Sequence, residues 1–158
     1  MAERRFGLGF DTHPREVARP LFLGGVEFVD EPGLSGHSDA DVVCHAIGDA
    51  LLGACGLGDL GDHFPDDDPT FAGMAGLDLL GRVVLIVRKA GFAPWSCDAT
   101  VIAERPRLAD ARPRMRENIA VALQVPRGRV SIKATRPEGM GLSGDGAACI
   151  ALAVLEEA

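Results

Sequence analysis

The sequence predicts an α/β (α+β) fold: a two-layer sandwich of ferredoxin-like type, with a mixed sheet and helices packed on one face. Segments with the alternating pattern of strands are interspersed with segments whose apolar residues recur at helical spacing, and no linker or internal repeat divides them. The 158 residues, of which 47% are hydrophobic, are enough to bury a core. We therefore expect one domain spanning 1–158.

The expected elements cover most of the chain. In order they are a strand over 6–13, a strand over 20–28, a helix over 38–54, a helix over 77–90, a strand over 97–103, a helix over 113–124, a strand over 130–134 and a last helix over 146–155. Gly24-Gly25 marks a bend in the second strand. Ser38 is the expected N-cap of the first helix, because Asp41 follows three residues later as in a capping box.

Positive charge is missing from a long part of the chain. The 62 residues from Pro20 to Gly81 contain no Lys or Arg but twelve Asp or Glu, whereas the other 96 carry all 16 basic residues and 11 acidic ones. The net charge of −7, the single Trp and the scattered bases argue against a nucleic-acid partner. No apolar run approaches the roughly 18 residues that span a membrane, so we expect no membrane partner either.

The cysteines indicate a reducing compartment. They show no C-x-x-C pairing and lie within apolar stretches, which is typical of buried free thiols: Cys44, Cys55, Cys97 and Cys149. The N-terminal residues lead directly into a strand-like segment, without the pattern of a signal or transit peptide. We expect a cytoplasmic protein.

Three residues of the first half have the chemistry of a metal site. Asp11 and His13 are two residues apart on a predicted strand, so their side chains project from the same face. His45 lies off the apolar stripe of the predicted helix, in surroundings without cations that would repel a metal ion. Carboxylate and imidazole suit a divalent ion such as zinc, and three protein ligands leave the open position of a catalytic site. For His45 alone, an ordinary solvated helix face remains the alternative.

Two further segments could hold phosphate. The free N–H groups at a helix start attract phosphate, and His37 beside Ser38 could donate to it. The glycine-rich segment from Lys133 to Gly146 could cradle phosphate through its backbone N–H groups, with Glu138 holding a hard cation such as Mg²⁺.

The loop over 56–69 is long for a structureless connection, which usually indicates function. It is either a solvated acidic loop or a lid whose Asp59 and Asp66 accept hydrogen bonds from substrate hydroxyls. The chain contains no Ser-His-Asp order, P-loop or G-x-G-x-x-G motif, so nucleophilic triads and dinucleotide cofactors lack support.

Taken in order, these segments resemble the 2-C-methyl-D-erythritol 2,4-cyclodiphosphate synthase family, zinc enzymes of the non-mevalonate isoprenoid pathway. The resemblance covers roughly residues 7–155, with correct order and spacing. The motifs that carry it are Gly9-Phe10-Asp11-Thr12-His13, Gly36-His37-Ser38-Asp39-Ala40-Asp41 through His45, Leu57-Gly58-Asp59-Leu60-Gly61, Phe64-Pro65-Asp66-Asp67-Asp68-Pro69, Ala103-Glu104-Arg105-Pro106-Arg107-Leu108 and Lys133-Ala134-Thr135 with Glu138.

The resemblance implies a role for each segment. The zinc ligands would be Asp11, His13 and His45. The catalytic residues would be His37, Ser38, Asp59, Thr135 and Glu138, of which Glu138 would also hold Mg²⁺ or Mn²⁺ together with substrate phosphates. Asp59, Gly61 and residues 64–68 would hold the methylerythritol part. Residues 103–109, with Thr135 and Glu138, would bind the cytidine diphosphate. The substrate-binding residues would be Asp11, His13, His37, Ser38, Asp59, Leu60, Gly61, Phe64, Pro65, Asp66, Asp67, Asp68, Ala103, Arg107, Leu108, Thr135, Arg136, Glu138 and Leu142.

The reaction implied is the conversion of 4-diphosphocytidyl-2-C-methyl-D-erythritol 2-phosphate to 2-C-methyl-D-erythritol 2,4-cyclodiphosphate and CMP. The 2-phosphate attacks the β-phosphorus of the same molecule. This fits the residues, because phosphoryl transfer needs positioning and charge neutralisation more than a protein nucleophile. The family is a homotrimer with active sites between subunits, so the basic part of one chain would face the acidic part of its neighbour.

The tail departs from the family pattern. Arg136 and Pro137 stand where the family usually has Thr, and Asp145 stands where it has Arg. Leu142 replaces a Phe, and Ala147 replaces a Glu. The loss of an arginine for Asp145 would weaken phosphate binding or disturb an ion pair, but the metal ligands are intact, so we expect activity. Two alternatives are a zinc-dependent phosphoesterase on the same scaffold and a non-catalytic nucleotide-binding trimer.

Overall fold

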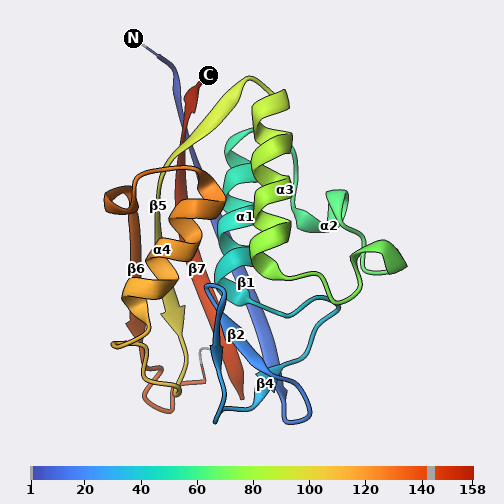
Figure 1. Ribbon diagram of the computed structural model, residues 1–158, viewed down its shortest axis with the longest axis vertical. Helices are drawn as coiled ribbons and strands as arrows, with labels where there is room; N and C mark the ends of the chain where they lie inside the picture. Colours follow the sequence, from blue (N-terminus) through green and yellow to red (C-terminus); the bar gives the residue numbers. More distant parts are fainter. Residues whose placement is uncertain (1, 142–144) are drawn as a thin grey trace.

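The computed structural model describes residues 2–141 and 145–158 (Figure 1). Its strands and helices, in chain order, are β1 (Arg4–Glu16), β2 (Leu21–Leu23), β3 (Val26–Phe28), β4 (Gly33–Leu34), α1 (Val42–Ala54), α2 (Leu60–His63), α3 (Gly76–Lys89), β5 (Phe92–Ile102), α4 (Arg112–Leu123), β6 (Val130–Thr135) and β7 (Gly146–Glu157). Short 3₁₀ turns lie at Pro69–Phe71 and Arg127–Arg129. Among these helices, none is long and apolar enough to cross a membrane.

The strands form one sheet in the order β4-β1-β7-β5-β6, together with a separate β2–β3 hairpin. β5 and β6 run parallel, whereas the other pairs of the sheet are antiparallel. The prediction of an α/β fold with a mixed sheet is therefore confirmed. Because Ile102 and Thr135 are register partners at the ends of β5 and β6, the loops that follow these strands begin side by side.

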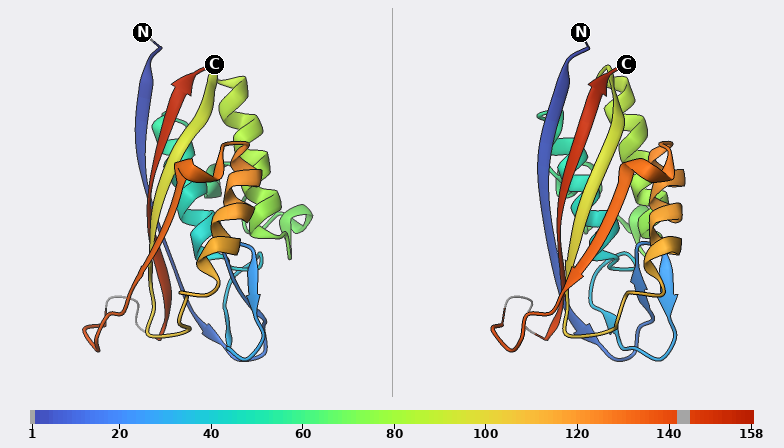
Figure 2. Two further views of the ribbon diagram at one scale, coloured as in Figure 1. Left: turned by 60° about the vertical axis from the view of Figure 1, so that its left-hand side comes forward. Right: turned by 90° about the vertical axis from the view of Figure 1, so that its left-hand side faces the viewer.

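The helices α1, α3 and α4 cover one face of the sheet and leave the other face bare (Figure 2). Glycines on β1 allow α1 to approach closely. A methyl group at Gly7 would lie 1.8 Å from the carbonyl oxygen of Ala50, and one at Gly9 would lie 1.9 Å from that of Ala46. Since neither position has room for a side chain, the glycines fix the distance between the strand that carries Asp11 and the helix that carries His45.

The bare face of the sheet carries large apolar side chains. In the register of β1 with β7, Leu8 lies opposite Leu152, and Phe10 lies opposite Ile150. Phe6, Leu8 and Phe10 are 65%, 71% and 52% exposed, and the two β7 residues are also exposed. An apolar patch of this kind usually marks an interaction surface.

The prediction of a last helix over 146–155 is wrong, because this segment is strand β7 in the middle of the sheet, between β1 and β5. Ala151, Ala153 and Leu155 are fully buried, while Ile150 and Leu152 between them are exposed, which is the period of a strand. A short apolar run does not by itself distinguish a strand from a helix. The element order consequently departs from the β-α-β-β-α-β unit of a ferredoxin-like fold.

The segment 20–28, predicted as one bent strand, is the β2–β3 hairpin. Its turn is Gly24-Gly25, with φ values of +58° and +70°. Two successive residues with positive φ are what a tight hairpin turn requires, so the glycines reverse the chain instead of bending it.

Helix α1 begins at Val42, with Asp41 as its N-cap, so the prediction of Ser38 as the cap is wrong. The Asp41 carboxylate is fully buried and accepts hydrogen bonds from the N–H groups of Val43 and Cys44. Its two oxygens also accept from the hairpin turn, at Gly24 and Gly25. This four-fold pairing outcompetes Ser38 as a cap, and the Ser38 hydroxyl accepts instead from the Ala40 N–H at 3.2 Å.

Candidate metal pocket and strand-end cleft

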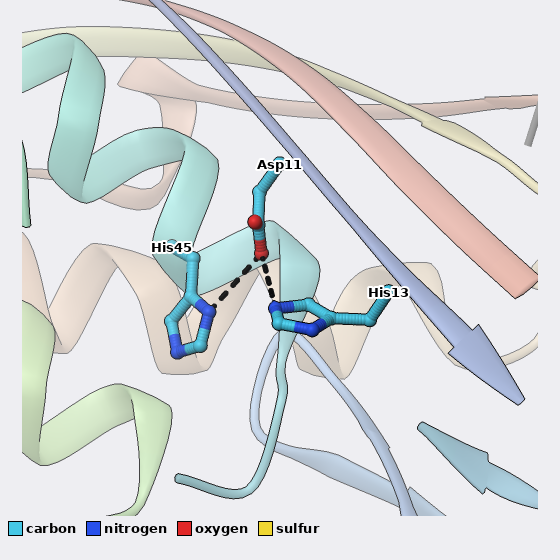
Figure 3. A group of neighbouring side chains, drawn as sticks. All are labelled: Asp11, His13 and His45. Carbon is cyan, nitrogen blue, oxygen red and sulfur yellow. Dashed lines mark hydrogen bonds and ion pairs between the residues drawn. The ribbon is translucent and has the colours of Figure 1, made fainter. Parts of the chain in front are cut away.

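Asp11, His13 and His45 converge from two elements of the core (Figure 3). Asp11 and His13 project from the same face of β1, and His45 reaches them from the first turn of α1. The Asp11 Oδ2 atom lies 3.0 Å from His13 Nε2 and 3.1 Å from His45 Nδ1. One donor atom of each residue lies within 4.8 Å of the others, so the three side chains could hold a metal ion.

The charges of this cluster favour a cation. Burial raises the pKa of Asp11, but the hydrogen bonds and charges of His13 and His45 outweigh it and bring that pKa well below its usual value. Burial lowers the pKa of His45, yet the hydrogen bond to Asp11 and the nearby charges of Asp11, Asp41 and Asp39 leave it raised. Both shifts show that positive charge at this point is stabilised by its surroundings.

Ser38 and His37 lie beside the cluster, on the segment between β4 and α1. The Ser38 hydroxyl is 3.0 Å from His45 Nε2, the ring nitrogen that faces away from Asp11. A partner on this nitrogen fixes the orientation of the imidazole ring, as is usual for metal-binding histidines. His37 Nε2 lies 3.4 Å from the carbonyl oxygen of Asp68, which brings the 64–68 loop to the same site.

These residues surround a cavity of about 340 Å³, called here the metal pocket. It brings together the three predicted zinc ligands and most of the residues predicted to hold the methylerythritol part of the substrate. It is lined by Asp11, His13, Gly36, His37, Ser38, His45, Asp49, Asp59, Leu60, Gly61, Phe64, Asp66, Phe71 and Leu79. Pro65 and Asp67 are exposed on the loop outside this lining, and the Asp68 side chain accepts a hydrogen bond from Thr70 N.

Asp59 is held at the rim of the metal pocket by a capping box. Its carboxylate accepts from the Asp62 N–H at the start of α2, and the Asp62 carboxylate accepts from the Asp59 N–H.

Asp49, which was not among the predicted site residues, lines the same pocket and accepts from Leu60 N at 2.8 Å. Its place one helical turn after His45 was the signal that could have identified it. Burial raises the pKa of Asp49, and the carboxylate of Asp59 adds to the rise.

A second cavity of about 250 Å³, called here the strand-end cleft, lies where β5 and β6 end. It brings together five predicted residues: Ala103, Arg107, Leu108, Thr135 and Arg136. Two more lining residues, Pro106 and Ala109, lie within the predicted segment 103–109, whereas Arg112 and Ala134 were not among the predicted site residues. Arg107, Arg112 and Arg136 give the cleft a cationic lining, whereas the metal pocket is lined by carboxylates and histidines.

Glu138 lies on the exposed turn beyond the strand-end cleft, with a φ of +53°. The neighbouring Gly139 N–H donates to the Glu104 carboxylate at 2.9 Å, which ties this turn to the loop after β5. Leu142, also predicted to contact substrate, lies outside the described residues.

The two cavities open in different parts of the molecule. The turn that carries Glu138 and the segment after α2 lie on opposite sides in Figure 1 and in the left view of Figure 2. The strand-end cleft begins at the ends of β5 and β6, whereas the metal pocket lies between β1, α1 and α2. One chain therefore presents two chemically different cavities.

The model of the YgbB family matches residues 4–156, which is nearly the whole chain. The chain belongs to the YgbB family. The family includes a 2-C-methyl-D-erythritol 2,4-cyclodiphosphate synthase of Symbiobacterium thermophilum that is 53% identical over 151 residues, covering 94% of this chain and 96% of the relative. The match extends over the lining residues of both cavities, which lie between Asp11 and Arg136.

Two solved structures share the fold. The bifunctional IspDF of Campylobacter jejuni superposes with a TM-score of 0.94 at 38% identity, and it covers 100% of this chain, which in turn spans 43% of that longer protein. A 2C-methyl-D-erythritol-2,4-cyclodiphosphate synthase solved in a form with bound CDP gives a TM-score of 0.88 at 32% identity, covering 96% of this chain and 99% of that one. The identification made from the motifs, as an enzyme of the cyclodiphosphate synthase family, is confirmed.

Proposed function

We propose that the chain closes 4-diphosphocytidyl-2-C-methyl-D-erythritol 2-phosphate to 2-C-methyl-D-erythritol 2,4-cyclodiphosphate, with release of CMP. The observation that carries the proposal is the convergence of Asp11, His13 and His45 in a pocket of a YgbB-family chain. In this reaction the 2-phosphate oxygen forms a bond to the β-phosphorus while the bond from that phosphorus to the CMP oxygen breaks. The step needs two anionic groups held in line, which is a task of positioning and charge neutralisation.

The donor set of the metal pocket fits zinc. One carboxylate oxygen and two imidazole nitrogens face one another, and three protein ligands are typical of zinc sites that keep a position open for substrate. A bound Zn²⁺ would supply Lewis-acid polarisation of a phosphate oxygen. The chain itself supplies the ring orientation, through Ser38 on His45 and through the Asp11 carboxylate between the two histidines.

Residues next to the metal ligands would hold the phosphates. His37 can donate an N–H to a phosphate oxygen and Ser38 a hydroxyl, and both line the metal pocket. Away from the metal pocket, Thr135 lines the strand-end cleft, and Glu138 follows on the adjoining turn. We assign Glu138 to a Mg²⁺ or Mn²⁺ ion shared with the diphosphate, because such hard ions prefer carboxylate and phosphate oxygens.

The remaining lining residues suit different parts of the substrate, so each cavity would bind one part. Asp59 and Asp66 offer acceptors for the hydroxyls of the methylerythritol part, and Gly61 lines the same cavity. The arginine-lined strand-end cleft suits the cytidine diphosphate. At about 340 and 250 Å³, the cavities lie at or below the lower end of the roughly 300–1,000 Å³ of drug-sized ligand pockets, so each suits part of the substrate.

A homotrimer with active sites between subunits would unite these halves. The metal pocket and the strand-end cleft share no lining residue, so each would be one half-site, and a cyclic assembly joins different surfaces of neighbouring copies. The bare apolar face of β1 and β7 supports self-association, because a second copy would remove Phe6, Leu8 and Phe10 from water. In such an assembly the cationic cleft of one chain faces the acidic pocket of its neighbour.

The test is an assay of CMP release by the purified protein loaded with zinc, in the presence of Mg²⁺ and with analysis of the phosphorus products. We expect equal amounts of CMP and cyclic diphosphate, and loss of both when a chelator removes the metals. Inorganic phosphate or a linear diphosphate without the cyclic product would instead identify a phosphoesterase. Tight binding of cytidine nucleotides without turnover would identify a non-catalytic binding protein.

A further inference from the structure

Arg19 lies in the turn between β1 and β2, directly before the stretch without Lys or Arg, and it is half-buried. One nitrogen of its guanidinium donates to the carbonyl oxygen of Gly36, and the other terminal nitrogen donates to that of Ser38. The carbonyl of His37, between them, accepts from the N–H of Gly73 at 3.0 Å. Three successive carbonyls are therefore held by fixed donors, and two of these donors belong to one guanidinium.

The segment that Arg19 holds lies against two of the proposed metal ligands. A methyl group at Gly36 would lie 3.2 Å from His13 Cε1, so the backbone at this glycine runs close to the imidazole ring. At the other end of the segment, the Ser38 hydroxyl lies 3.0 Å from His45 Nε2. His37 lies between these two contacts and lines the metal pocket.

We propose that Arg19 is a positioning residue for the reaction. By holding the carbonyls of Gly36 and Ser38, it fixes the side chains of His37 and Ser38 relative to the metal ligands before substrate binds. This inference rests on the proposed function, in which His37 and Ser38 contact the reacting phosphates. Misplacement of such groups by about 1 Å reduces the rate of a positioned reaction by roughly 100-fold.

The planar guanidinium is required because its two terminal nitrogens reach two acceptors at once. A lysine has a single ammonium on a flexible stem, so it can retain the positive charge but cannot hold both carbonyls in the same geometry. Arg19→Lys and Arg19→Ala therefore separate the effect of the positive charge from that of the two simultaneous hydrogen bonds.

Arg116 provides a matched control. It is also half-buried, and its side chain donates to two backbone carbonyls, at Val130 (2.8 Å) and Arg127 (3.3 Å). These contacts join α4 to the start of β6 and touch neither cavity lining. Arg116→Ala thus removes a comparable structural arginine without disturbing the segment at 36–38.

The experiment measures kcat and KM for CMP release, the zinc content, and amide hydrogen exchange over residues 36–40 in the zinc-loaded proteins. We expect Arg19→Ala to lower kcat by about 100-fold, with KM changed by less than about fivefold and zinc still bound at one ion per chain. Arg19→Lys should recover only part of kcat, and exchange over 36–40 should increase in both variants. Arg116→Ala should keep kcat within about twofold of the parent, even where its Tm falls.

Equal kcat values for Arg19→Ala and Arg116→Ala, or unchanged exchange over 36–40, would overturn the proposal. If Arg19→Ala does not fold, full activity of Arg19→Lys would also overturn the proposal, because the two simultaneous hydrogen bonds of the guanidinium would then be dispensable. Failure of the proposed function itself is distinguishable: the parent protein would release no CMP, while the exchange measurement would still show whether Arg19 holds the segment.

Discussion

The metal pocket and the strand-end cleft differ in how the chain builds them. In the metal pocket, side chains from β1, α1 and the segment before α1 are hydrogen-bonded to one another: Asp11 to His13 and His45, and His45 to Ser38. In the strand-end cleft, the lining comes from the loop after β5, the end of β6 and the start of α4, and the glutamate assigned to it stands on an exposed turn. The metal pocket is organised by contacts within one chain, whereas the proposed assembly would complete the strand-end cleft with the surface of a neighbour.

This difference has a physical origin in burial. Asp41 is fully buried and is satisfied by four backbone N–H groups, so the start of α1 has one low-energy arrangement. The cleft loops lie at the surface, where water can satisfy their polar groups equally well in several arrangements. Substitutions should therefore separate metal binding from nucleotide binding.

The largest effect is expected from His45→Ala, which removes a ligand from the organised half-site. We expect loss of stoichiometric zinc and a fall in CMP release of about 1,000-fold or more, because the metal supplies several kcal/mol of transition-state stabilisation. His63→Ala is the control, since His63 bonds the Leu57 carbonyl outside the cavity lining. Full zinc occupancy of His45→Ala, measured by elemental analysis, would show that the ligand assignment is wrong.

Leu8→Asp tests whether the second half-site needs a neighbour. A carboxylate at this 71% exposed position would be buried in the proposed assembly without a partner, so the trimer should dissociate and activity should fall by about 100-fold. Light scattering would measure the mass, which is 16.6 kDa for one chain. Leu85→Asp alters an exposed leucine on the helical side and should change neither the mass nor the rate. Full activity of a monomeric Leu8→Asp protein would contradict the shared site.

Arg107→Ala should weaken nucleotide binding and leave the metal in place. A hydrogen bond to a charged group contributes about 1.5–3 kcal/mol, so the Kd for CDP should rise roughly 10- to 100-fold. Zinc content should be unchanged, because Arg107 lines only the strand-end cleft among the two cavities. Calorimetric titration would measure the Kd for CDP. Arg114→Ala is the control, because Arg114 is an exposed arginine of α4. Loss of zinc from Arg107→Ala would show that the half-sites are not separable.

The smallest effect concerns thiol reactivity beneath the metal pocket. Cys44 precedes His45, and Cys149 is the register partner of Asp11; both are buried, and burial raises their pKa. Burial also raises the pKa of Cys97 to about 12, which leaves about one part in 10⁴ as thiolate at pH 8.

A disulfide reagent should therefore modify Cys55, which is only partly buried, before the other thiols of the native protein. All four should react after denaturation, and the native reactions should accelerate as pH rises, because the thiolate fraction increases. Equal rates at Cys55 and Cys149 would show that the packing under the metal pocket is loose.

The sequence predicted that Asp11, His13 and His45 come together, because strand and helix periodicities are local properties. Asp11 and His13 share a face through the two-residue period, and His45 lies off the apolar stripe of its helix. The start of α1 was misplaced because both Ser38 and Asp41 are good caps, and the hydrogen bonds that decide between them come from the distant Gly24 and Gly25. β7 was misread because its pairing with two other strands is not visible in its own residues.

The contacts of Arg19 were likewise inaccessible to local patterns, because its two acceptors are backbone carbonyls seventeen and nineteen residues away. The bare apolar face could be recognised only in the structure. There Gly7 and Gly9 contact α1, so Phe6, Leu8 and Phe10, which alternate with them, point to the opposite side of the sheet. Both features are decided by tertiary packing.

In the proposed trimer, each active site combines the metal pocket of one chain with the strand-end cleft of another. Mixing His45→Ala and Glu138→Ala chains, after dissociation and reassembly, tests it most directly. Neither variant should release CMP alone, but random mixed trimers should recover about a quarter of the parent activity, because half of the pockets and half of the clefts are intact and pair independently. If the mixture stays as inactive as each variant although mass analysis shows mixed trimers, both half-sites must come from one chain.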